Sequence, residues 1–114
     1  MPQMPQLVLA TGDQLHGFRV VSVTPVEPIF AVAYHLEHIA SGAKVLHVHT
    51  EDTENLFSIN FLTPPPDDTG LPHIIEHCVL AGSEKFPVRE PFFEMIKMSM
   101  ATFINAMTGK DCTY

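Results

Sequence analysis

Three consecutive prolines at residues 64–66 constrain the fold of this chain more than any other feature, because proline has no backbone N–H to donate to a helix or a sheet. Before these prolines, apolar and polar side chains alternate with a period of two, which is typical of β-strands. After them, the apolar side chains recur every three or four residues, which is typical of helices. The sequence therefore predicts a sheet-forming first half and a helical second half.

The first half predicts an antiparallel sheet of about four strands within residues 18–63. β-Branched residues dominate the beginning of this region, and residues 30–37 alternate cleanly between an apolar and a more polar face. Residues 44–50 and 56–63 are expected to form the remaining two strands. Residues 1–6 hold two prolines and two glutamines and are expected to form a loose tail.

The second half predicts two helices. The first helix is predicted over residues 71–82. Polar residues of the types that commonly cap helix N-termini precede it, and Pro72 suits its first turn. Pro91 opens the second, whose predicted range is 91–104. The apolar positions of this second helix are Phe92, Ile96, Met100 and Phe103. The predicted fold class is therefore α+β, an antiparallel sheet followed by two helices.

Composition limits the classes of function. The chain has 114 residues, which suffice for one small domain, and its formal net charge of −7 makes binding to nucleic-acid phosphates unfavourable. The longest unbroken apolar run, residues 29–34, is far too short to cross a bilayer, so no membrane association is expected. Because the N-terminus resembles neither a secretory signal nor an arginine-rich transit peptide, a cytoplasmic location is expected. An organelle matrix is the alternative if a targeting segment has been removed.

The most informative stretch is residues 73–77, His-Ile-Ile-Glu-His, inside the first predicted helix. Residues four apart lie on one helix face, so His73 and His77 can bind a single ion, with Glu76 on the same side. Two neutral imidazoles suit Zn²⁺ and leave a position open for water, from which a nearby carboxylate can take a proton. This is the inverted zincin arrangement and predicts peptide hydrolysis. The alternative is a solvated helix face that carries these polar residues without a metal.

Other histidines lie in the predicted sheet. His35 and His38 fall at a strand end and point to different faces, which favours an exposed polar strand end. His47 and His49 are two apart on one strand, but with no third ligand nearby they are interpreted as residues of a polar face. A simple metal-binding module that combines His47, His49 and His73 stays open as an alternative.

Seven short stretches match a known family in the same order along the chain. They are residues 41–43, 55–59, 69–77, 80–83, 86–87, 90–92 and 102–107. On these stretches the chain resembles the beginning of the insulinase (pitrilysin) family of zinc peptidases, in the branch that contains the presequence proteases. The resemblance extends from about residue 41 to the last residue.

The resemblance implies a zinc-dependent endopeptidase that degrades unfolded peptides. It implies that His73 and His77 are zinc ligands, with one Zn²⁺ per catalytic site, and that Glu76 is the general base acting on zinc-bound water. It also implies that Asn105 and Ala106 belong to an edge strand to which the substrate backbone adds.

In this family the third zinc ligand is a glutamate many tens of residues beyond the second histidine, and no residue of this chain occupies that position. We therefore expect an N-terminal fragment of a larger α+β catalytic domain, inactive alone and binding zinc weakly or not at all. Its expected partners are peptide substrates and the remainder of its own chain. Exposed sheet edges and apolar surface predict that the fragment self-associates. A non-catalytic subunit or structural module of the same family is the alternative, although the three motif residues are intact.

Overall fold

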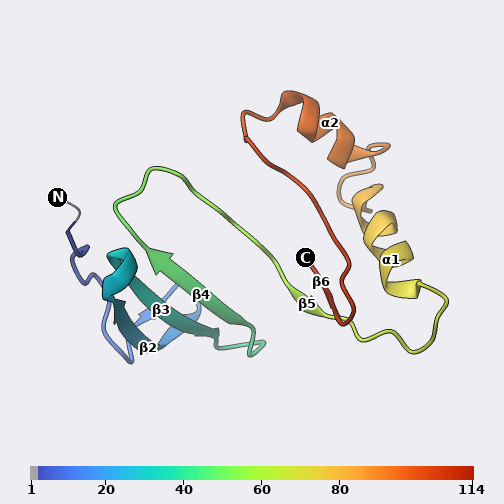
Figure 1. Cartoon of the computed structure of the whole chain (residues 1–114). Helices are drawn as coiled ribbons and strands as arrows, with labels where there is room; N and C mark the ends of the chain where they lie inside the picture. Colours follow the sequence, from blue (N-terminus) through green and yellow to red (C-terminus); the bar gives the residue numbers. More distant parts are fainter. Residues whose placement is uncertain (1–2) are drawn as a thin grey trace. The chain divides into compact units, whose positions relative to one another are not determined.

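A computed structural model describes residues 3–114, which form two compact units (Figure 1). The first unit ends at Asn55 and the second comprises Leu56–Tyr114. A four-stranded antiparallel sheet forms the first unit, and the second holds both α-helices. The predicted α+β fold class is therefore confirmed.

The sheet of the first unit has the strand order β1-β2-β3-β4. Its elements are β1 (Gln14–Leu15), β2 (Phe18–Val26), the 3-10 helix η1 (Glu27–Ile29), β3 (Ala31–His38) and β4 (Lys44–His49). On the central strand β3, Tyr34 lies opposite Val23 of β2 and opposite His47 of β4. Because residues directly opposite one another share a face, this register places side chains from three strands side by side.

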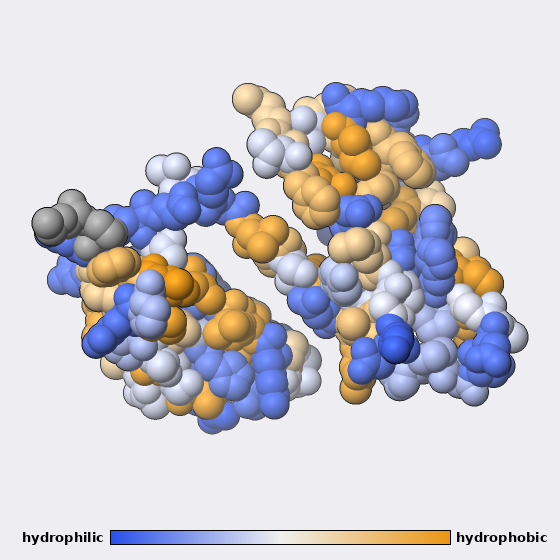
Figure 2. All heavy atoms as spheres, in the orientation of Figure 1, coloured by the Kyte–Doolittle hydropathy of each residue, from blue (hydrophilic) through white to orange (hydrophobic). Residues whose placement is uncertain are grey.

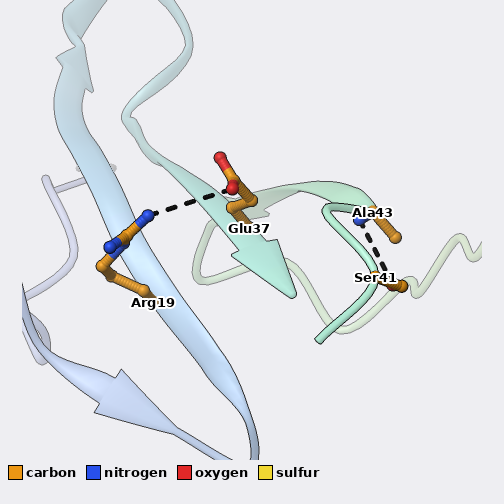
Figure 3. Close-up of polar contacts among 4 residues, drawn as sticks. All are labelled: Arg19, Glu37, Ser41 and Ala43. Carbon is orange, nitrogen blue, oxygen red and sulfur yellow. Dashed lines mark hydrogen bonds and ion pairs between the residues drawn. The ribbon is translucent and has the colours of Figure 1, made fainter. Parts of the chain in front are cut away.

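Two polar contacts lie at the end of the sheet where β3 leads into β4. Arg19 lies opposite Glu37, and their side chains form an ion pair with an N–O distance of 3.9 Å (Figure 3). Both side chains are largely exposed to solvent, so the pair contributes little stability. In the turn that leads to β4, the hydroxyl of Ser41 accepts a hydrogen bond of 3.4 Å from the backbone N–H of Ala43 (Figure 3). Gly42 between them has a φ of 70°, which glycine adopts without strain.

The buried core of the first unit is small and lies on the two central strands. It consists of Val20, Ala31, Val32 and Tyr34. The hydroxyl of Tyr34 accepts a hydrogen bond of 3.1 Å from the backbone N–H of Val8, which ties the N-terminal segment to the sheet. Apolar side chains of that segment and of the sheet, together with His47 and His49, line a hollow of about 500 Å³.

We expect Tyr34→Phe to lower the free energy of unfolding of the first unit by about 1 kcal/mol, because the N–H of Val8 loses its partner. Amide hydrogen exchange at Val8 should become faster in the same variant. Chemical denaturation and exchange mass spectrometry would measure both effects. Tyr114→Phe is the matched control, since the side chain of Tyr114 is 43% exposed. Unchanged exchange at Val8 would show that the hydrogen bond does not hold this segment.

The second unit contains two helices and a small sheet. Its elements are β5 (Phe61–Leu62), α1 (Leu71–Leu80), α2 (Pro91–Met98) and β6 (Cys112–Thr113). β5 pairs antiparallel with β6, so that Phe61 lies opposite Thr113. Met107 and Tyr114 exchange two backbone hydrogen bonds of 2.6 and 2.9 Å, so residues 107–114 fold back as a hairpin. This hairpin, which includes β6, therefore follows both helices and returns to β5.

The first helix begins where the sequence predicts. Gly70 precedes α1 with a φ of 73°, and proline stands in the first turn, where its missing N–H costs no hydrogen bond. The second helix ends at Met98, earlier than the predicted range of 91–104, because Ser99 is already extended. Met100 is fully exposed and Phe103 is 68% exposed. A periodic apolar face stabilises a helix mainly by packing, and these two side chains have little of it.

One predicted strand is misplaced. Of residues 56–63, only Phe61–Leu62 forms a strand, and it pairs with β6 and not with β4. Leu56 and Phe57 are 90% and 85% exposed, so β-forming residue types alone did not produce a strand here. The sheet reaches four strands through β1, which the sequence analysis did not predict. A two-residue turn at His16 and Gly17, with φ values of 49° and 83°, joins β1 to β2 in the manner of a type I′ hairpin.

The surface of both units carries many large apolar side chains (Figure 2). The predicted loose tail at residues 1–6 is described only in part, because residues 1 and 2 lie outside the described residues. Residues 3–6 belong to no helix or strand, although Pro5 is buried. Within residues 3–114, no helix has the length and apolar character needed to cross a membrane.

Candidate metal centre

The two predicted zinc ligands lie next to each other on α1. The Nε2 atoms of His73 and His77 are 3.1 Å apart, and their ring centroids are 4.9 Å apart. Both side chains are exposed and so accessible to an ion from solvent. Two nitrogens bound to one tetrahedral zinc, each at about 2.0–2.1 Å, are separated by about 3.3 Å. The donor atoms and their separation therefore fit Zn²⁺ with only a small adjustment.

A hollow of about 400 Å³ lies beside His73. Its lining includes His73, Thr108 and the acidic turn that precedes α1. In that turn the hydroxyl of Thr69, and secondly its backbone N–H, hydrogen-bond to Asp67 and hold the pKa of this carboxyl below its usual value. Asp67 is therefore ionised at neutral pH and places a negative charge at the rim of the hollow.

The predicted general base is held from one side. Glu76 exposes only 7% of its surface and is the one buried charged residue among residues 3–114. Its Oε2 accepts a hydrogen bond of 2.7 Å from Oγ1 of Thr108, which stands 32 positions later, in the hairpin. The sequence analysis identified Glu76 but not Thr108, because no local spacing connects the two. The fold therefore gives the carboxylate of Glu76 a partner that the sequence pattern did not indicate.

The predicted substrate-binding residues stand just before the hairpin. Asn105 and Ala106 belong to no strand in the structure, and antiparallel pairing begins with Met107 and the bridge between Thr108 and Thr113. Asn105 is exposed and Ala106 is half-buried. The role of these two residues in binding a peptide backbone stays a prediction.

Two further candidate metal ligands, His47 and His49, lie on β4 of the first unit. Among residues 3–114, no group of three or more histidine, cysteine, aspartate and glutamate side chains is arranged to hold a metal ion. His47 and His49 share one face of β4 with ring centroids 5.8 Å apart, and the ring of His47 stacks on Tyr34 at 6.0 Å. They belong to the first unit and His73 to the second, so a metal-binding module that combines these three histidines stays a prediction.

We expect His47→Gln combined with His49→Gln to leave zinc affinity within about twofold of the unmodified chain, because the α1 pair is unchanged. Titration of Zn²⁺ against a chromophoric competing chelator would measure this affinity. The doubly substituted chain His73→Gln and His77→Gln serves as the comparison and should lose binding. Loss of zinc in the β4 variant, with α1 intact, would favour a metal-binding module built on His47 and His49.

Comparison with known proteins identifies close relatives, although no family model matches the chain. Over 104 residues it is 54% identical to a protein of Xenopus tropicalis named presequence protease, mitochondrial. Proteins of the same name from Mus musculus and Saccharomyces cerevisiae are 52% and 50% identical over 102 and 103 residues. Each match covers 90–91% of this chain and 10% of the relative, so the chain spans about a tenth of the length of these relatives. Over the segment that it spans, this chain is therefore similar in sequence to proteins named presequence protease, mitochondrial.

Proposed function

We propose that this chain supplies the metal-binding part of a zinc endopeptidase that degrades unfolded peptides. The observation that carries the proposal is the 3.1 Å separation of the His73 and His77 Nε2 atoms, with Glu76 on the same helix. The relatives, named as mitochondrial presequence proteases, support peptides as the substrate class and a mitochondrial compartment as the location.

The chemistry divides among three side chains. His73 and His77, as neutral imidazoles, offer one nitrogen lone pair each to the metal. When bound, Zn²⁺ polarises a peptide carbonyl and lowers the pKa of water. Glu76 takes the proton of the attacking water and later returns it to the leaving amine. Its Oε2 is engaged by Thr108, so the proton is received by Oε1.

Full activity requires residues beyond the two histidines and Glu76. A catalytic zinc site has three protein ligands, and α1 provides two of them. We therefore propose that the third ligand comes from outside these 114 residues, and that the isolated chain is inactive and binds zinc weakly. The exposed side chains of Leu56, Phe57 and Met100 give the isolated chain an apolar surface that favours self-association.

Zinc content and hydrolysis of an unstructured peptide, measured on the full-length protein, test the proposal. We expect about one zinc per catalytic site, loss of hydrolysis after chelation, and recovery when Zn²⁺ is returned. A stably folded protein is the control substrate and should stay intact. The isolated 114-residue chain should show no turnover. Full hydrolysis by the metal-free protein would contradict a zinc mechanism, and a full-length protein with neither zinc nor turnover would favour a non-catalytic subunit.

A further inference from the structure

We propose that Thr108 is a positioning residue that holds the carboxylate of Glu76 in the orientation required of the base, an inference that rests on the proposed function. The hydroxyl oxygen of Thr108 lies 2.7 Å from Oε2 of Glu76. Both residues are shielded from solvent, Glu76 with 7% of its surface exposed and Thr108 half-buried. This hydrogen bond joins α1, which carries Glu76, to the hairpin of residues 107–114.

The hydroxyl of Thr108 donates this hydrogen bond and Oε2 of Glu76 accepts it. The lone pairs of Thr108 then face Thr113, whose hydroxyl oxygen is 3.4 Å away. Thr113 in turn lies 2.8 Å from the hydroxyl of Thr63, just after β5. Three threonine hydroxyls therefore form a chain that ends on Glu76.

The backbone around Thr108 holds its side chain in place. Thr108 and Thr113 form a bridge, and Gly109 N–H donates a hydrogen bond of 2.7 Å to the carbonyl of Cys112. Thr63 N–H donates a further hydrogen bond of 2.7 Å to the carbonyl of Asp111. Threonine is also branched at Cβ, which restricts its χ1 rotamers. The backbone hydrogen bonds and the restricted χ1 rotamers therefore hold the hydroxyl of Thr108 next to Glu76.

This arrangement leaves Glu76 with one oxygen for chemistry. A buried carboxylate without a partner is costly, and a hydrogen bond from a neutral hydroxyl offsets part of that cost without adding a charge beside the base. With Oε2 held, rotation of the carboxylate is restricted and Oε1 is left for proton transfer. Thr108 contacts the base and none of the reacting atoms, so its role is positioning.

Three substitutions distinguish an effect of Thr108 on the orientation of the Glu76 carboxylate from an effect on folding. Thr108→Val removes the hydroxyl at nearly constant shape, Thr108→Ser keeps it, and Thr53→Val removes an exposed threonine hydroxyl of the first unit as a control. In the full-length protein, we expect Thr108→Val to lower kcat by roughly 10- to 100-fold, with zinc content unchanged and KM within about twofold. Thr108→Ser and Thr53→Val should keep kcat within about threefold of the unmodified protein.

A second measurement is independent of turnover. The ¹³C NMR signal of the Glu76 carboxyl in the 114-residue chain should shift in Thr108→Val and stay in place in Thr108→Ser. Unchanged kcat in Thr108→Val, in a protein whose turnover depends on Glu76, would overturn the positioning role alone. Turnover that does not depend on Glu76 would overturn the proposed function and the positioning role with it. If Thr108→Val loses zinc while Thr108→Ser retains it, the hydroxyl acts on the fold and the proposal is wrong.

Discussion

Glu76→Gln is expected to lower kcat for peptide hydrolysis by about 10²- to 10⁴-fold in the full-length protein, the range that general-base catalysis supplies. Glutamine has the same shape as glutamate and a carbonyl oxygen that can accept the hydrogen bond from Thr108, so the local structure should persist. It cannot take a proton from water at neutral pH. Zinc content should therefore stay unchanged while turnover is lost, as measured by metal analysis and steady-state kinetics.

The matched control for this variant is Glu94→Gln on α2. Glu94 is an exposed carboxylate of the same unit, and its side chain pairs with Lys97 at 2.8 Å. Its replacement removes one negative charge without touching α1, so kcat should stay within about twofold. Equal losses in the two variants would mean that net charge, and not proton transfer by Glu76, governs the rate.

Replacement of His73 or His77 by Gln is expected to weaken zinc binding by more than about 100-fold, since the loss of an outer partner of a ligand already costs 10- to 100-fold. Each substitution leaves a single imidazole where two nitrogens now lie 3.1 Å apart. Titration against a competing chelator in the full-length protein would measure the affinity.

His35→Gln provides the control for the histidine substitutions. His35 lies on β3 of the first unit, opposite Leu46, and its replacement also removes one imidazole. Zinc affinity in this variant should equal that of the unmodified protein. Retention of full affinity in both His73→Gln and His77→Gln would show that the metal binds elsewhere.

Features that depend on neighbouring residues could be predicted from the sequence. α1 begins at Leu71, and the proline in its first turn is a local signal that indicated this start. The expected cap from the preceding polar residues was wrong, because Gly70 occupies the cap position and no side chain caps the helix. Within it, the spacing of His73 and His77 was sufficient to bring their nitrogens together, because a helix fixes that geometry over four residues. The α+β class followed from the change of period at residues 64–66.

Features that depend on distant partners could not be predicted. Nothing near Glu76 indicates Thr108, which the hairpin brings to it from 32 positions away. Residues 56–63 have the composition of a strand, but a strand also needs a partner, and only β5 within this range has one. β1 was missed for the opposite reason, since two residues are too few to show an alternating pattern.

The pairing of β5 with β6 has a consequence for the order in which this unit folds. The hydroxyls of Thr63 and Thr113 meet across 50 positions of chain, and both helices lie within that loop. Closure of a loop of this length costs entropy before its contacts repay it, whereas α1 needs only local hydrogen bonds. The pair of His73 and His77 is therefore expected to form early, and the hydrogen bond between Thr108 and Glu76 is expected to form late. The two imidazoles would then lie next to each other before Thr108 reaches the carboxylate of Glu76, so that the hydrogen bond between Thr108 and Glu76 reports on the last step of folding of this unit.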